Sequence, residues 1–125
     1  MATASSDSSG LPTPLVLVVE DEPIIAINTE MMLSSMGYEN VEVVGSVADA
    51  MALLDRARVE FAILDLSLGN ETSIPVAERL CGENIPVIIT TGFEEVDLPA
   101  VCAGTPILRK PYRLGDLESM IASIR

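Results

Sequence analysis

The chain alternates between short runs of consecutive apolar residues and longer segments in which apolar residues recur at helical spacing. The apolar runs predict strands at residues 15–19, 41–44, 61–64 and 87–90, with a weaker fifth strand at 105–108. Most of these runs are apolar at successive positions, as strands buried on both faces of a sheet must be. The pattern therefore predicts five strands with helices on both sides of them.

The segments between the strands carry helix signals. One helix is predicted to begin at Pro23, a residue suited to a first helical turn, and to end before Gly37. In the next, Ser46 and Asp49 form a capping box ahead of an apolar stripe. A similar stripe runs from Leu114 to the end of the chain. The predicted fold is α/β: a single, doubly wound, five-stranded parallel sheet in the flavodoxin-like order 2-1-3-4-5.

The stretch from residue 92 to 106 departs from this alternation. It should hold the fourth helix, but Pro99 stands in its middle, where it would remove a backbone hydrogen bond and clash with the preceding turn. We expect a shortened, irregular or mobile fourth helix there.

The domain organisation follows from length and composition. Residues 1–14 are small, polar and interrupted by glycine and proline, which predicts a disordered N-terminal tail. Residues 15–125 suffice for one domain, and no output domain is expected after the last helix. The formal charge of −12 disfavours nucleic acid and anionic membrane surfaces as partners and favours cations and basic protein faces.

Several kinds of chemistry can be set aside. The chain has no histidine, which excludes histidine ligands and histidine acid–base catalysis. Cys81 and Cys102 lack metal or redox spacing and are predicted to be reduced, packed thiols.

Because no long apolar span or signal peptide is found, we expect a cytoplasmic protein. Met31, Met32 and Met51 are predicted to fill the core.

Acidic residues follow two strands that this order makes neighbours. Glu20, Asp21 and Glu22 come after the first strand, and Asp65 comes after the third. Ligands of open parallel sheets bind beyond the carboxyl ends of the strands. Carboxylates gathered in one crevice repel one another unless a cation neutralises them, and Mg2+ prefers such oxygen ligands. A Mg2+ site is therefore predicted.

A hydroxyl and an ammonium group are expected at the same edge. Thr90 and Thr91 stand at the end of the fourth strand, and Lys110 follows the fifth. A carboxylate nucleophile, a metal site, a hydroxyl and a lysine suit phosphoryl transfer, and aspartate is an established covalent carrier of phosphate. Asp65 is the predicted phosphoacceptor.

These motifs resemble a known family. The stretches VVEDEP, LDLSLG, IITTGF and LRKPY, in that order, look like the receiver domains of bacterial two-component response regulators. The resemblance covers residues 15–125. It implies that Glu20, Asp21, Asp65 and the main-chain carbonyl of Ser67 bind Mg2+, that Asp65 is phosphorylated, and that Thr91 and Lys110 contact the phosphoryl group. By the same analogy the Lys110–Pro111 peptide is expected to be cis.

One departure from the family pattern affects the switch. Receivers usually place an aromatic residue three positions before the lysine, where this chain has Ile107, so the usual aromatic switch cannot operate. The TTGF and KPY runs resemble the single-domain FATGUY subgroup. Phe93 or Tyr112 could replace the missing aromatic residue, and ordinary packing is an equal alternative for both.

Each motif also has a simpler interpretation by itself. Glu20–Glu22 could be an acidic helix start, Asp65 a cap, Thr91 a turn residue and Lys110 an exposed charge. Their coincidence at matching strand ends favours the phosphorylation site. A haloacid-dehalogenase-type phosphatase would need a second aspartate where Ser67 stands, and the acidic cluster would repel flavodoxin's phosphate. An adaptor that keeps the fold without phosphorylation remains a further alternative.

The expected function is that of a single-domain response regulator rather than an enzyme. Its phosphodonor would be a sensor histidine kinase or a histidine phosphotransfer protein, and phosphorylation of Asp65 would alter binding to a downstream protein target. A monomer or weak dimer is expected.

Overall fold

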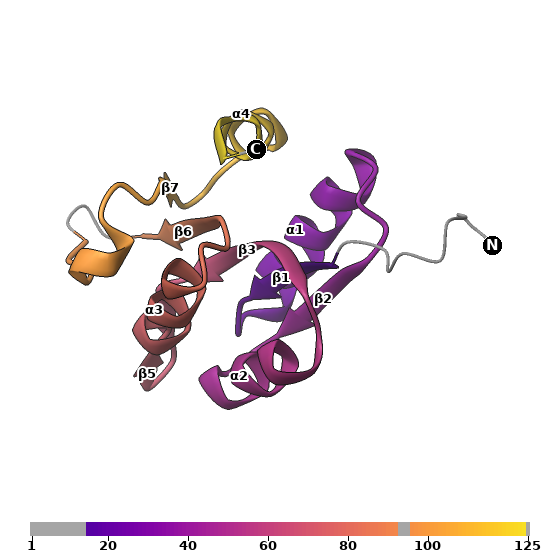
Figure 1. The fold of residues 1–125 in the computed structure, drawn as a ribbon. Helices are drawn as coiled ribbons and strands as arrows, with labels where there is room; N and C mark the ends of the chain where they lie inside the picture. Colours follow the sequence, from indigo (N-terminus) through magenta and orange to yellow (C-terminus); the bar gives the residue numbers. More distant parts are fainter. Residues whose placement is uncertain (1–14, 93–95, 125) are drawn as a thin grey trace.

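The computed structural model describes residues 15–92 and 96–124, so the predicted tail at residues 1–14 lies outside the described residues (Figure 1). Five parallel strands form one sheet in the order β2-β1-β3-β6-β7. The strands are β1 (Leu15–Val19), β2 (Val41–Val44), β3 (Val59–Asp65), β6 (Val87–Thr91) and β7 (Ile107–Arg109). Numbered by their place among these five, they give the order 2-1-3-4-5, which confirms the predicted doubly wound fold.

Helices cover both faces of the sheet. Figure 1 shows α1 (Pro23–Ser35) and α4 (Leu114–Ile124) on one side and α2 (Val47–Arg56) and α3 (Ile74–Gly82) on the other. A short 3-10 turn, η1 (Ala100–Cys102), packs beside α3. This arrangement leaves the carboxyl ends of the strands open between loops, and that edge holds the predicted site.

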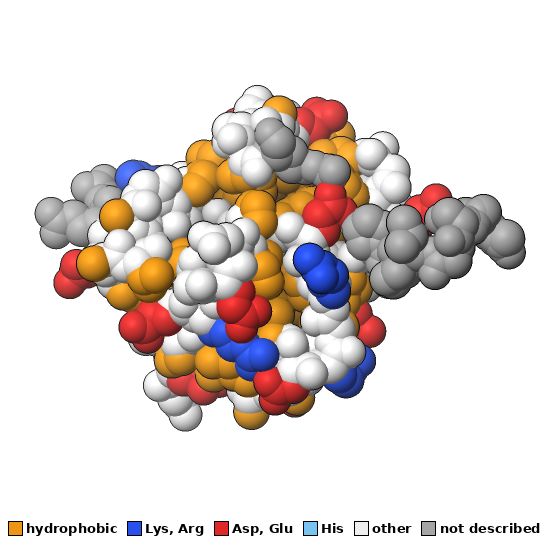
Figure 2. Space-filling view, in the orientation of Figure 1, with side chains coloured by type: hydrophobic (Ala, Val, Ile, Leu, Met, Phe, Trp, Pro, Cys, Tyr) orange, Lys and Arg blue, Asp and Glu red, His pale blue; other side chains and the backbone are white. Residues whose placement is uncertain are grey.

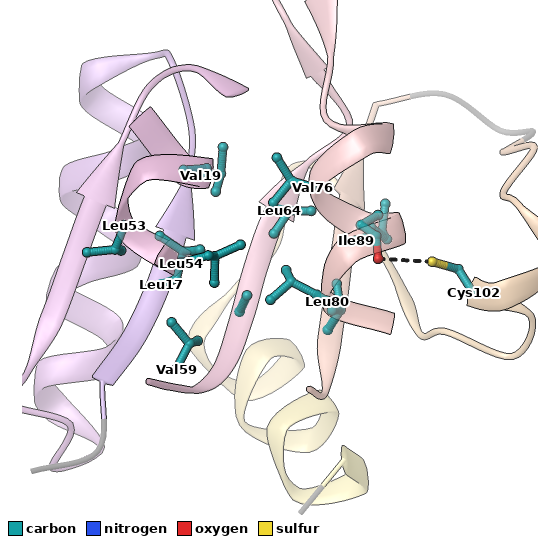
Figure 3. Packing of buried hydrophobic residues seen from close by; sticks show 14 of the residues in the cluster. Leu17, Val19, Leu53, Leu54, Val59, Leu64, Val76, Leu80, Ile89 and Cys102 are labelled. Carbon is teal, nitrogen blue, oxygen red and sulfur yellow. Dashed lines mark hydrogen bonds between the residues drawn. The ribbon is translucent and has the colours of Figure 1, made fainter. Parts of the chain in front are cut away.

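The core has two apolar layers, one on each side of the sheet, because successive strand residues point to opposite faces. In the layer shown in Figure 3, leucines of α2 and α3 pack against β1 and β3. In the other, Leu33 of α1 and Leu117 and Ile121 of α4 pack against the opposite sides of the same strands. Strands buried on both faces explain why the sequence showed unbroken apolar runs.

Most element boundaries agree with the sequence pattern. The hydroxyl of Ser46 accepts a hydrogen bond from the Asp49 amide at 3.1 Å, so the predicted cap opens α2. Two strands differ: β3 is longer than predicted, Val59–Asp65 instead of 61–64, and β7 is Ile107–Arg109 instead of residues 105–108. Pro106 has no N–H to donate, although its carbonyl accepts a bond from Ile89. The ladder therefore starts at Ile107, two residues later than predicted.

The described part of the fourth crossover is irregular, as expected from Pro99. Within residues 96–106 the helical structure is the three-residue turn η1, which Pro99 precedes as the N-cap. The Cys102 amide donates to the Pro99 carbonyl at 2.9 Å. Residues 93–95, including Phe93, lie outside the described residues.

Two expectations about sulfur-containing residues were wrong. Cys81 and Cys102 are joined as a disulfide and are not reduced thiols. Although they are 21 residues apart, the crossover brings η1 against α3, a proximity that sequence spacing does not reveal. Met31 is 64% exposed on α1, whereas Met32 and Met51 do pack against the core.

The surface over α2 and α3 is charged. Figure 2 shows acidic and basic side chains next to one another there. Arg79 of α3 contacts Asp55 of α2 at 2.8 Å and Glu83 at 3.0 Å. Within residues 15–92 and 96–124, every helix is too short or too polar to span a bilayer.

Candidate phosphoacceptor site

Three carboxylates meet at the carboxyl edge of the sheet. Glu20, Asp21 and Asp65 each place an oxygen within 4.8 Å of the other two. Glu20 and Asp65 are about 95% buried, and Asp21 is exposed. Sequence order and sheet topology together predicted this cluster.

The strand register explains the meeting. Val19 of β1 pairs with Leu64 of β3, so the residues that follow them, Glu20 and Asp65, lie side by side at the carboxyl edge of the sheet. The Glu20 amide continues the ladder by donating to the Val44 carbonyl at 2.9 Å. Asp21 then turns outward ahead of α1, and its carboxylate stays open to solvent.

Lys110 is the chain's single lysine, and it is the cation of this cluster. Its ammonium donates to Asp65 Oδ2 at 2.8 Å and lies 3.1 Å from Glu20 Oε1. Its amide donates to the Thr91 carbonyl at 2.8 Å, which ties β7 to the end of β6. The Lys110–Pro111 peptide is cis, as expected.

Burial of these charges shifts their pKa values. Burial raises the pKa of Glu20 above 4.5, although hydrogen bonds from the Glu22 amide and Lys110 act in the opposite direction. Burial alone would lower the pKa of Lys110, but its bonds to Asp65 and Glu20 outweigh that effect and raise it above 10.5. Lys110 is therefore charged at neutral pH.

The residues present fit Mg2+. Three carboxylates face one lysine, so the cluster has more acidic groups than cations. In addition, burial disfavours the charged form of Glu20. A hard cation held by a few carboxylate oxygens would relieve both costs. Glu20, Asp21 and Asp65 are the carboxylates that could hold it. Ser67 lies two residues beyond Asp65, and its amide donates to Asp65 Oδ1 at 3.3 Å.

A small hairpin that the sequence interpretation missed borders the cluster. β4 (Ser67–Leu68) pairs antiparallel with β5 (Glu71–Thr72), and Gly69 begins the two-residue turn with a φ of +65°. Glu71 Oε2 accepts a hydrogen bond from the Val47 amide at 3.2 Å and so ties the hairpin to α2. The Gly–Asn pair at 69–70 was a usable turn signal.

We expect Gly69→Ala to lower the free energy of unfolding by about 1–2 kcal/mol, because an L residue is strained at positive φ. The added Cβ would also lie 3.5 Å from Asp21 Oδ2. Urea unfolding at neutral pH measures the loss. Gly82→Ala is the matched control, since Gly82 ends α3 and a Cβ added there would meet no atom outside its own helix backbone and chain neighbours within 4 Å. Equal losses in the two variants would contradict the prediction.

The two threonines of β6 have different surroundings. Thr90 pairs with Asp65 across the sheet, and its hydroxyl donates to the Leu64 carbonyl at 3.4 Å. Thr91, which is expected to contact the phosphoryl group, is buried at the last position of the strand. Its side chain points to the opposite face from Thr90, because side chains alternate along a strand.

Tyr112 is anchored to α1. Its hydroxyl and that of Thr29 are 2.6 Å apart, and its ring packs in the layer beneath α1 and α4. Ile107, where receivers usually have an aromatic residue, is 39% exposed on β7. Of the two open alternatives for Tyr112, the contacts favour packing that holds the Lys110–Pro111 turn against α1.

Burial raises the pKa of Tyr112 above 10.0. The folded protein therefore keeps the phenol proton at a pH where the unfolded chain releases it. The resulting stability is complete below the ordinary pKa and is lost as the pH rises through the raised one. Tyrosinate absorbance during alkaline titration should show a late step that Tyr112→Phe removes. If the late step persists in Tyr112→Phe, the raised pKa does not belong to Tyr112.

A separate recess of about 740 Å3 lies at the opposite edge of the sheet. It is lined by residues 54–60 and 83–86, and none of the predicted site residues is among them. This recess has charged side chains of its own, but the three carboxylates that converge with Lys110 lie at the other edge of the sheet.

Known proteins resemble this chain over most of its length. Residues 16–122 match the family described as response regulator receiver domain. The transcriptional regulatory protein PdtaR of Mycobacterium tuberculosis is 29% identical over 121 residues, which are 94% of this chain and 59% of PdtaR. The chain thus spans about three fifths of that relative's length.

Solved structures agree as well. SdrG from Sphingomonas melonis Fr1 is 34% identical with a TM-score of 0.76, covering 89% of this chain and 95% of SdrG. The BeF3-activated conformation of SdrG from Pseudomonas melonis Fr1 has a TM-score of 0.72 at 34% identity, covering 87% and 93% of the two chains.

Proposed function

Because the chain belongs to the response regulator receiver family, we propose that Asp65 accepts a phosphoryl group from a phosphohistidine in a Mg2+-dependent reaction. The donor is a sensor histidine kinase or a histidine phosphotransfer protein. The observation that carries the proposal is the buried Asp65 carboxylate, which lies among acidic neighbours and is paired with the chain's single lysine.

The chemistry needs a positioned nucleophile. An Asp65 oxygen attacks phosphorus, the bond from phosphorus to the donor's imidazole nitrogen breaks, and that nitrogen keeps the electron pair and is protonated. Lys110 is already oriented toward this place and stabilises charge on the phosphoryl oxygens. Mg2+, when bound, would neutralise further charge on the same oxygens.

The response differs from an aromatic switch. With Ile107 on β7, no ring can turn inward at that position. We assign the switch to Thr91, whose hydroxyl would contact the new phosphoryl group, and the output to the crossover segment between β6 and β7. The change in contacts would bias that segment toward a form that binds a downstream protein.

An apolar surface beside the site supports a protein donor. Ile24, Ile27 and Met31, on one face of α1, are 75%, 55% and 64% exposed. An apolar recess of about 330 Å3 adjoins this helix and is lined in part by Lys110, Pro111 and Tyr112. A helix of a donor protein could bury this face while presenting its phosphohistidine to Asp65.

Comparing a protein phosphodonor with a small one tests whether the apolar face of α1 binds the donor protein. Ile27→Asp should slow phosphorylation by a phosphotransfer protein that is active on the native chain by about tenfold or more, because an unpaired charge would be buried. Phosphorylation by acetyl phosphate should be unchanged. Ala48→Asp, on the exposed side of α2, is the control. A loss with both donors would place the defect in the acidic cluster instead of in docking.

Intact-mass measurement tests the central proposal. The native chain incubated with Mg2+ and acetyl phosphate should gain one phosphoryl group. Asp65→Asn should gain none, and the adduct should be lost in mild base, as acyl phosphates are. An adduct that persists in Asp65→Asn, or no adduct with several donors, would overturn the proposal and favour a phosphorylation-independent adaptor.

The phosphatase alternative is not favoured. Ser67 stands where a haloacid-dehalogenase-type enzyme needs its second aspartate. We propose a signalling phosphoacceptor whose catalysis is limited to its own phosphorylation and dephosphorylation. PdtaR is a transcriptional regulatory protein, but this chain matches only part of it. We therefore propose no transcriptional role for this chain.

A further inference from the structure

The disulfide joins residues 96–106, the described part of the crossover before β7, to the body of the domain. Cys81 lies near the end of α3, and Cys102 ends η1. Their Cα atoms are 5.5 Å apart, an ordinary spacing for a disulfide. Cys102 also packs on α3, with its sulfur 3.3 Å from the Ala77 carbonyl oxygen (Figure 3).

Cys102 is the main anchor of this segment. Among residues 96–106 it is the one residue that is fully buried, at 1% exposure. Leu98 is half-buried against the same core layer, and Val101 is 52% exposed. The rest of η1 therefore depends on the Cys102 contact to stay on α3.

The bond closes a loop around the proposed switch. The two cysteines are 21 residues apart, and β6 with Thr91 at its end lies between them. A crosslink limits the conformations that the enclosed chain can reach. Any movement that carries η1 away from α3 requires this bond to open.

We propose that Cys81 and Cys102 form a reversible redox site that takes low-molecular-weight disulfides, such as oxidised glutathione, and that its oxidation restrains the segment which responds to phosphorylation. The restraint on η1 is independent of phosphorylation. Its effect on the response rests on the function proposed above.

Thiol–disulfide exchange accounts for the chemistry. Cys81 is partly exposed, so it meets the oxidant first. Its thiolate attacks glutathione disulfide, forms a mixed disulfide and releases one glutathione thiolate. The Cys102 thiolate then attacks the Cys81 sulfur and releases the second. The cysteine pair loses two electrons and two protons, and two glutathione thiols are formed. Excess reduced glutathione reverses both steps.

Alkylation under denaturing conditions measures the redox state. Protein equilibrated with oxidised glutathione should take up no alkyl group, and protein equilibrated with reduced glutathione should take up two. Each state should convert fully to the other. Two alkylated thiols under both conditions, or stable glutathione adducts in place of the internal bond, would overturn the redox site.

Hydrogen exchange measures the restraint. The amides of Cys102, Ala103 and Thr105 are hydrogen-bonded within the segment and serve as probes. They should exchange about tenfold more slowly in the oxidised protein, because the tether suppresses local opening. Cys81→Ala keeps Cys102 buried but cannot form the bond, so it should match the reduced protein under both conditions. Equal exchange in oxidised and reduced native protein would refute the restraint.

Repeating the measurement with beryllofluoride and Mg2+ separates the two proposals. If both hold, beryllofluoride should change exchange in residues 96–106 more in the reduced than in the oxidised protein. An equal change in both states would overturn redox control of the response. No change in either state, with the redox difference intact, would count against the phosphorylation switch and leave the redox site standing.

Discussion

Asp21→Asn should weaken Mg2+ binding by about tenfold or more, since affinity for a hard cation depends on the number of charged oxygen ligands. Asp21 is the exposed member of the cluster, so its replacement disturbs no buried contact. Replacing Asp21 therefore tests the metal site more directly than replacing Glu20, whose side chain also pairs with Lys110. Calorimetric titration with Mg2+ measures the affinity without any phosphodonor.

Glu118→Gln is the matched control, because it removes an exposed carboxylate from α4 outside the cluster. Its Mg2+ affinity should equal that of the native chain. Phosphorylation by acetyl phosphate should fall in Asp21→Asn and recover partly at high Mg2+ concentration. Equal Mg2+ affinity in all three proteins would remove Asp21 from the metal site.

Lys110→Met should slow phosphorylation of Asp65 by about 100-fold or more, the usual cost of losing one preorganised charged donor. Methionine keeps most of the side-chain length and removes the ammonium that bonds to both buried carboxylates. The rate of adduct formation, followed by intact mass at fixed Mg2+ and acetyl phosphate, measures the effect. Arg113→Met, an exposed cation in the next turn, should react at the native rate.

The same substitution should also destabilise the fold at neutral pH. Lys110→Met leaves Glu20 and Asp65 buried without their cation. Adding Asp65→Asn removes one of these charges and should restore part of the free energy of unfolding. A native phosphorylation rate in Lys110→Met, or a double variant less stable than the single one, would show that Lys110 does not have this role.

Some parts of the site follow directly from sequence. Glu20, Asp21 and Asp65 were placed together because apolar runs identified β1 and β3 and the parallel topology makes these strands neighbours. Lys110 was placed there for the same reason, since it follows the edge strand. These inferences hold because carboxyl ends of parallel strands share one edge, whatever the details of packing.

Other parts could not be derived in this way. The hairpin around Gly69 has strands of two residues, too short to show an alternating pattern. The Tyr112–Thr29 contact joins residues 83 positions apart and depends on how α1 lies on the sheet. Met31 followed the helical spacing of core residues, yet α1 is apolar around much of its circumference and only one side meets the sheet.

The sequence by itself determined the alternation of strands and helices and the interrupted fourth crossover, because hydrophobic periodicity and proline chemistry act locally. With the connection rules of parallel sheets it also determined the strand order and the set of charged residues at one edge. Only the tertiary structure decided that Lys110 bonds to both Asp65 and Glu20 and that Cys81 pairs with Cys102. Such pairings depend on separations of a few ångströms between distant segments, and those separations are set by the packing of helices on the sheet.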